Sequence, residues 1–88
     1  MHVTVVSPEQ AVFDGSADAV VAPAYDGQVG ILPHHAPFLT LLGTGVLTVR
    51  QGGGGGGGGA ATRFRVSGGF LQVVGDAVRI VADRVDAS

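Results

Sequence analysis

The sequence predicts an all-β domain, a small sandwich or barrel of short strands. Apolar residues alternate with polar ones at a period of two in several segments, which is typical of strands with one face in the core and one in water. Turn-forming residues recur about every eight to twelve residues, a spacing found in sandwiches and barrels. No segment has the length and pattern of a useful helix.

Three segments show the alternation that predicts half-buried strands. Polar residues such as Thr4 and Arg79 lie between their apolar positions. Because successive side chains of a strand point to opposite faces, we predict that the apolar ones are buried. These are Val3, Val5, Phe64, Val66, Val78 and Ile80.

Four further strands are predicted from short runs that are rich in β-branched and aromatic residues and bounded by Gly, Pro or Asp. They cover residues 19–22, 29–32, 46–49 and 70–74. Pro33 and Pro37 cannot donate to a strand ladder, so the segment between them should be a turn or a sheet edge. Gly and Asp predict turns at residues 14–15, 26–27, 43–45, 68–69 and 75–76.

The length of 88 residues fits a single domain that spans residues 1–88. The apolar fraction of 45% excludes the class of chains that are too polar to fold. No apolar stretch approaches the ~20 residues of a membrane span, and the N-terminus does not resemble a secretion signal. The chain has no cysteine, which excludes disulfides and thiolate metal sites. We therefore expect a soluble mature protein.

The charges argue against a nucleic-acid partner. The chain has five arginines, no lysine and seven carboxylates, which give a net charge of -2. Binding to phosphates requires a clustered basic face. The small number of cations predicts that no such face forms.

The run of glycines at residues 52–59 contains the spacings of two nucleotide-binding motifs. Those motifs bind phosphate at the start of a helix, whereas this run leads into the predicted strand around Phe64 and is followed by no phosphate-loop lysine. We interpret it as a flexible hairpin loop.

Residues that could do chemistry lack the partners that catalysis needs. His34 and His35 are adjacent and would point to opposite faces of an extended chain, so they cannot easily share a metal. The serines lie outside any nucleophile elbow, and a small sandwich offers little room for a sugar cleft between two carboxylates. We predict no catalytic, cofactor-binding or metal-binding residues, and no cofactor.

One segment resembles the signature of a known family. Residues 26–40 read DGQVGILPHHAPFLT, similar to the motif D/E-G-x-x-G-I-L-P-x-H-A-P-L-L/V-T of the epsilon subunit of F-type ATP synthases. Residues 5–9, 12–15, 45–49, 66–73 and 78–83 are similar, in the same order, to other strands of that family. The similarity covers nearly the whole chain apart from the glycine run.

The resemblance implies a β-sandwich of two sheets with about ten short strands. It also implies a non-catalytic rotor subunit at the foot of the central stalk, which links the gamma subunit to the c-ring and couples proton flow to ATP synthesis. Such a subunit is peripheral, on the cytoplasmic face of the cell membrane, as part of the ATP synthase.

The resemblance also suggests contact residues. Ser7, His35 and Thr40 match positions that face the gamma subunit, and Gln28 matches a position that faces the c-ring. Gln28 is neutral where the family often has an acidic residue, which removes any salt link there. His34 stands where the family commonly has Gly or Asn.

Members of the family usually continue into a two-helix hairpin that restrains ATP hydrolysis and in some bacteria binds ATP. This sequence stops at Ser88, so we expect no ATP binding and no restraint. Two other functions suit a small all-β domain. A lipoyl or biotinyl carrier is excluded because it needs a modifiable lysine. A small all-β ligand- or oligonucleotide-binding module stays open, although we expect the aromatic residues to lie in the core, away from bases. The aromatic residues are Phe13, Tyr25, Phe38, Phe64 and Phe70.

Overall fold

The computed structural model describes residues 1–33, 36–51 and 60–87. His34, His35, the glycine run and Ser88 lie outside these residues. The described residues form eight strands: β1 (His2–Val6), β2 (Ala11–Ser16), β3 (Ala19–Ala24), β4 (Gly27–Ile31), β5 (Phe38–Leu41), β6 (Thr44–Gln51), β7 (Ala60–Val74) and β8 (Ala77–Ala87). None of the described residues belongs to a helix that could cross a membrane.

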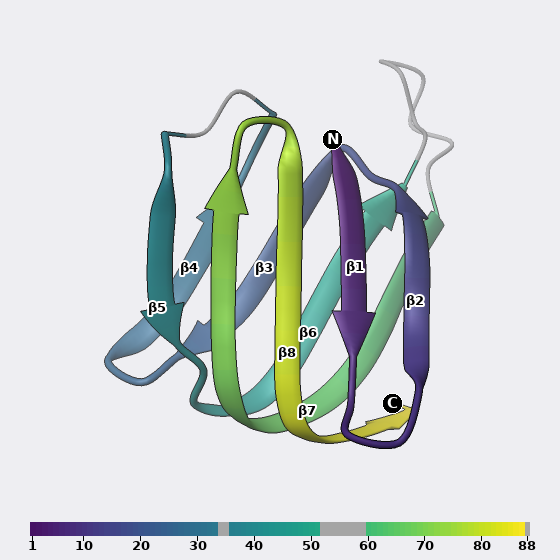
Figure 1. Cartoon of the computed structure of the whole chain (residues 1–88), viewed down its shortest axis with the longest axis vertical. Helices are drawn as coiled ribbons and strands as arrows, with labels where there is room; N and C mark the ends of the chain where they lie inside the picture. Colours follow the sequence, from purple (N-terminus) through teal and green to yellow (C-terminus); the bar gives the residue numbers. More distant parts are fainter. Residues whose placement is uncertain (34–35, 52–59, 88) are drawn as a thin grey trace.

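The strands form two layers that face each other (Figure 1). The front layer contains β2, β1, the first half of β8, the second half of β7, and β5, which pairs only with β7. The back layer contains β4, β3, β6, the first half of β7 and the end of β8. All neighbouring strands are antiparallel except β1 and β8. The predicted all-β sandwich is confirmed, but the two layers belong to one continuous sheet and not to the two sheets that were expected, because β7 and β8 pass from one layer to the other.

The described residues contain fewer strands than the ten or so that were expected, because β7 and β8 are long and serve both layers. The turn predicted at residues 68–69 is wrong. Gly68 and Gly69 lie inside β7, where the strand bends from the back layer into the front layer (Figure 1). Both have positive φ, 70° and 104°, a conformation that favours glycine. The two glycines thus make a corner in one strand and do not separate two strands.

Two of the other turn predictions are confirmed, and a third is wrong. The turns at residues 26–27 and 75–76 are confirmed, since Asp26 lies in the β3–β4 turn and Gly75 has a φ of 58° in the β7–β8 turn. The turn at residues 14–15 is wrong, because Asp14 and Gly15 pair with Thr4 and Val3 inside the edge strand β2. An edge strand tolerates residues that favour turns, since only one of its sides must match a partner.

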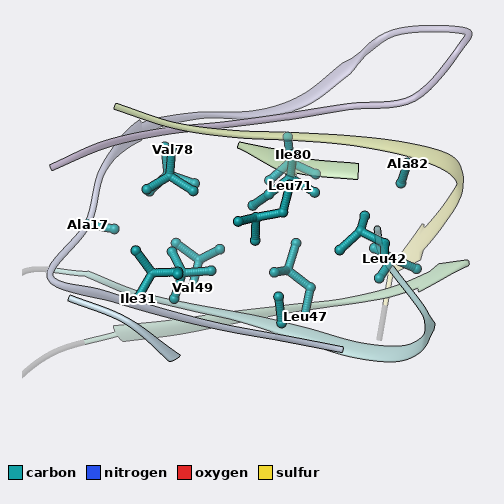
Figure 2. Close-up of a cluster of buried hydrophobic side chains, with 14 of the residues drawn as sticks. Ala17, Ile31, Leu42, Leu47, Val49, Leu71, Val78, Ile80 and Ala82 are labelled. Carbon is teal, nitrogen blue, oxygen red and sulfur yellow. The ribbon is translucent and has the colours of Figure 1, made fainter. Parts of the chain in front are cut away.

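The core fills the space between the layers (Figure 2). Every side chain in it is apolar, and no described polar or charged residue is buried. Five of the six predicted core residues are confirmed: Val3, Val5, Val66, Val78 and Ile80. Phe64 is only half-buried and packs edge-on against Phe13, with ring centroids 6.3 Å apart.

The expectation that the aromatic residues lie in the core is only partly correct. Phe13, Phe38 and Phe64 are half-buried and pack against the core. Tyr25 is 70% exposed and Phe70 is 37% exposed. The prediction is wrong for Tyr25 and Phe70 because neither side chain faces the core. Tyr25 lies in a turn, and Phe70 lies on the outer side of the front layer.

The pairing of β6 with β7 leads to a prediction about the glycine run. Gln51 and Ala60 face each other across an antiparallel pair, which is the geometry that a two-residue turn closes. Replacement of residues 52–59 by Asn-Gly reduces the closure entropy by about 1 kcal/mol, since each halving of loop length saves about 0.6 kcal/mol. Thermal unfolding should show an unchanged or higher Tm. A marked loss of stability would mean that the run makes contacts that hold the domain together.

Candidate protein-binding surface

The outer side of the front layer carries a cluster of exposed apolar side chains, here called the apolar surface. It consists of Leu39, Leu41, Phe70 and Val74. Leu39 and Leu41 are 67% and 63% exposed, and Val74 is 57% exposed. Exposed apolar side chains are ordinary when scattered, but a contiguous group commonly marks a binding site.

Strand pairing brings these side chains together. Leu41 lies opposite Phe70, and Leu39 lies opposite Gln72. Side chains that face each other across antiparallel strands have Cβ atoms about 5 Å apart, so the leucines and Phe70 form one continuous patch. A shallow hollow in this patch is lined by Leu39, Thr40, Leu41, Phe70 and Gln72. The hollow is mainly apolar and suits an apolar side chain of another protein.

Alternation along β5 separates Thr40 from its neighbours. Phe38 and Thr40 are half-buried and lie opposite the buried residues Val73 and Leu71, whereas Leu39 and Leu41 point outward. The Thr40 hydroxyl donates to its own strand, to the Leu41 carbonyl at 3.4 Å. The predicted contact residue therefore lines the hollow, but the outward contacts belong to the leucines beside it.

Ser7 lies elsewhere in the front layer. It follows β1 and opens the turn to β2, where both its amide and its hydroxyl donate to the Gln10 carbonyl, at 2.9 and 3.2 Å. Strand β8 lies between β1 and β7, and β7 lies between β8 and β5, which separates Ser7 from Phe70 on β7 by about 10 Å and from the leucines on β5 by about 14 Å. Ser7 and Thr40 thus belong to one layer without being in contact.

Gln28 lies in the back layer, near the start of the edge strand β4, and is exposed. The β3–β4 turn beside it lies at the same end of the molecule as the β1–β2 turn (Figure 1). Tyr25 is in that turn and projects into solvent. The end that carries Gln28 therefore also presents an exposed aromatic side chain.

Ser7, Gln28 and Thr40 lie in separate parts of the molecule, and His35 is outside the described residues. Leu39, Leu41 and Phe70 were not predicted as contact residues. Their signal was present, since residues 38–42 and 70–74 are apolar at nearly every position. An edge strand that is apolar on both faces needs a cover on each. The sequence signal for the apolar surface is therefore an unbroken run of apolar residues, and not an alternation of apolar and polar ones.

A second surface gathers arginines on the outer side of the back layer. The arginine surface consists of Arg50 on β6, Arg63 and Arg65 on β7, and Arg84 on β8, all exposed. The expectation that this chain cannot form a clustered basic face was therefore wrong. It relied on the small number of cations, whereas the strand register places four of the five on one face.

The described residues contain no group of three or more His, Asp or Glu side chains that could hold a metal ion. The hydroxyls of Thr44 and Ser67 lie 3.1 Å apart beside the arginine surface, but neither contacts a base or a buried carboxylate. The candidate sites among the described residues are therefore the apolar surface and the arginine surface.

Comparison with known proteins identifies relatives of the chain. The sequence model of the family described as ATP synthase, Delta/Epsilon chain, beta-sandwich domain, matches residues 1–87. The ATP synthase epsilon chain of Desulforamulus reducens is 43% identical over 82 residues, which cover 93% of this chain and 58% of that protein. That of Moorella thermoacetica is 39% identical over 88 residues, which cover 100% of this chain and 62% of that protein. The chain thus spans about three fifths of the length of these curated relatives.

Solved structures share the fold. A chain in the mitochondrial ATP synthase of Euglena gracilis matches with a TM-score of 0.84 at 22% identity, over 97% of this chain and 51% of that chain. A chain in the central stalk and c-ring of the Tetrahymena thermophila mitochondrial ATP synthase matches with a TM-score of 0.78 at 21% identity, over 99% of this chain and 66% of that chain.

Proposed function

Because the chain belongs to the ATP synthase delta/epsilon chain β-sandwich family, we propose that it is a non-catalytic subunit in the central stalk of an F-type ATP synthase. Residues 1–88 form one β-sandwich domain that links the gamma subunit to the c-ring. The subunit turns with the rotor and couples proton flow to ATP synthesis. It performs no chemistry itself and acts through the surfaces that it presents.

The apolar surface is the single observation that supports this function most strongly. A small domain that exposes two leucines, a phenylalanine and a valine side by side gains free energy when a partner covers them. Full burial of one such side chain is worth roughly 1.5–3 kcal/mol before the costs of association. We assign the apolar surface to the gamma subunit, with Leu39, Leu41 and Phe70 as the anchors.

The residues inferred from the resemblance fit around this centre. Thr40 lines the hollow between the leucines, and Ser7 lies at the far side of the same layer. We place both at the margin of the gamma contact. The assignment of His35 to that contact stays a prediction, since it lies outside the described residues.

We assign the end of the molecule that carries the β3–β4 turn to the c-ring. Gln28 and Tyr25 are exposed there. A neutral amide and an aromatic ring with a polar tip can make hydrogen bonds and apolar contacts without a salt link. The subunit is then peripheral to the membrane, held by the complex on its cytoplasmic face.

Leu41→Glu tests the gamma assignment. The Leu41 side chain points outward, so a glutamate there stays solvated in the free protein but brings an unpaired charge into an apolar contact. Co-purification with a tagged gamma subunit should fall at least about tenfold, while the Tm changes by only a few degrees, because a surface substitution typically costs within about 0.5 kcal/mol. Leu41 is a better test than Thr40, whose half-buried side chain also affects folding.

Gln28→Glu is the matched control. It introduces the same charge at an exposed position, but in the back layer. Co-purification with the gamma subunit should be unchanged. If Leu41→Glu bound the gamma subunit as well as the wild type did, the apolar surface would not be the contact.

A further inference from the structure

We propose that the arginine surface binds an acidic polypeptide segment through pairs between guanidinium groups and carboxylates. This surface lies on the back layer, and the apolar surface lies on the front layer. The inference therefore does not rest on the proposed contact with the gamma subunit. It adds a second partner surface to the domain.

The strand register arranges the four arginines in one row. Arg63 lies opposite Thr48, which places Arg50 diagonally across from it on β6. Arg65 follows two positions along β7, and Arg84 is its diagonal neighbour on β8, because Ser67 lies opposite Arg84. Each step in the row spans about 7 Å between Cα atoms. The row crosses three strands.

Carboxylates lie mainly at the two ends of this row, beside Arg84 and Arg50. Asp86 lies opposite Arg65, and its oxygen is 3.9 Å from the Arg84 nitrogen. Asp18 lies at the margin, where its amide donates to the Arg50 carbonyl. Arg63 and Arg65 make no ion pair with any residue that the structure describes. Arg84 also shares a hollow with Glu9, Asp83 and Asp86, so the uncompensated positive charge of the row lies on Arg63 and Arg65, on a chain whose net charge is -2.

The chemistry of the row favours carboxylates. All four cations are guanidinium groups, whose planar fork holds a carboxylate with two parallel hydrogen bonds. In an extended peptide, side chains on one face repeat about every 7 Å, which matches the step of the row. The face carries no large exposed apolar side chain, so polar contacts have to supply the affinity.

Nucleic acid is a weaker candidate for this face. Single strands bind where aromatic side chains stack on bases, and the nearest aromatic side chain, Phe64, points to the core side of β7. The carboxylates on the remaining surface, including Asp14, Asp26 and Asp76, repel a long polyanion more than a short acidic segment. A short segment of carboxylates therefore fits the face best.

A peptide titration tests the proposal. The probe is a fluorescent peptide of alternating glutamate and serine, about ten residues long so that it spans the row, and its anisotropy is measured with the whole protein at ~20 mM salt. The combined change of Arg63→Gln and Arg65→Gln should weaken binding about tenfold, since each exposed pair contributes up to about a fivefold effect. Arg79→Gln removes the one arginine on the front layer and should change binding less than about twofold.

Two comparisons make the test decisive. A peptide with glutamine in place of glutamate should not bind, and the proposal is overturned if it does. It is also overturned if Arg79→Gln weakens binding as much as the double change does. Binding of single-stranded DNA or of anionic phospholipid vesicles at least tenfold tighter than the peptide would assign the face to that polyanion instead.

Discussion

Gly69→Ala should lower the free energy of unfolding by at least about 3 kcal/mol, enough to leave much of this small domain unfolded. A methyl group at this position would meet the Val81 carbonyl oxygen at 1.9 Å and the Ala82 Cα at 2.8 Å. Both are backbone atoms of the neighbouring strand and cannot rotate away. The φ of 104° is also strained for any residue with a Cβ.

The location of Gly69 makes this cost hard to relieve. Gly69 pairs with Ala82 on β8, and its carbonyl accepts a hydrogen bond from the Leu42 amide at 2.9 Å. Moving the backbone to accept a methyl group would disturb both contacts at the corner where β7 changes layers. Thermal unfolding should show a Tm at least about 12 °C lower, at the 4–8 °C per kcal/mol expected of a domain this size.

Gly30→Ala is the matched control. Gly30 lies in β4, has no positive φ, and a methyl group there would meet nothing within 4 Å. The Tm of the Gly30→Ala protein should stay the same or rise, because alanine loses less backbone entropy on folding than glycine does. A Gly69→Ala protein with the Tm of the wild type would mean that the corner is not held as described.

The same glycines show where prediction from sequence fails. Gly68 and Gly69 have the composition of a turn, and nothing local distinguishes a turn that ends a strand from a corner within one. Only the pairing of both halves of β7 with β8 settles the difference, and that pairing is not visible in the residues around Gly68 and Gly69. Alternating segments such as that of Val3 and Val5 were predictable, because a period of two defines the buried face locally.

The candidate site was predictable as a region but not as side chains. The signature in residues 26–40 pointed to the family, which the comparison confirms. It also directed attention to Thr40, yet the structure turns Leu39 and Leu41 outward. Which of two neighbouring residues faces a partner depends on the register of an edge strand, and a one-residue shift reverses it.

The arginine surface could not be predicted from composition at all. Arg50, Arg63 and Arg84 are far apart in the sequence and meet because β6, β7 and β8 are neighbours in a fixed register. A count of charges gives the net charge of a chain but not its distribution over the surface. The order of the strands therefore carries information on binding that the residue types lack.

Leu71→Ala should lower the free energy of unfolding by about 3 kcal/mol or more, which is the other large effect that the structure predicts. Leu71 is fully buried and lies with Ile80 on the front layer, facing Leu47 on the back layer (Figure 2). The core of so small a domain is thin, so the cavity left by truncation has few neighbours that can move in to fill it. Thermal unfolding should show a Tm lower by roughly 12 °C or more.

Leu39→Ala is the same substitution on the other face of the same layer, and it separates folding from assembly. Leu39 is exposed, so the Tm should stay within a few degrees of the wild type, while affinity for the gamma subunit should fall about tenfold if Leu39 is an anchor. Leu71→Ala should show the reverse at a temperature where it is still folded, because its core position does not touch a partner. If Leu39→Ala also unfolded the domain, or if Leu71→Ala lost gamma binding while folded, the division between a core that builds the sandwich and an outer apolar surface that binds would be wrong.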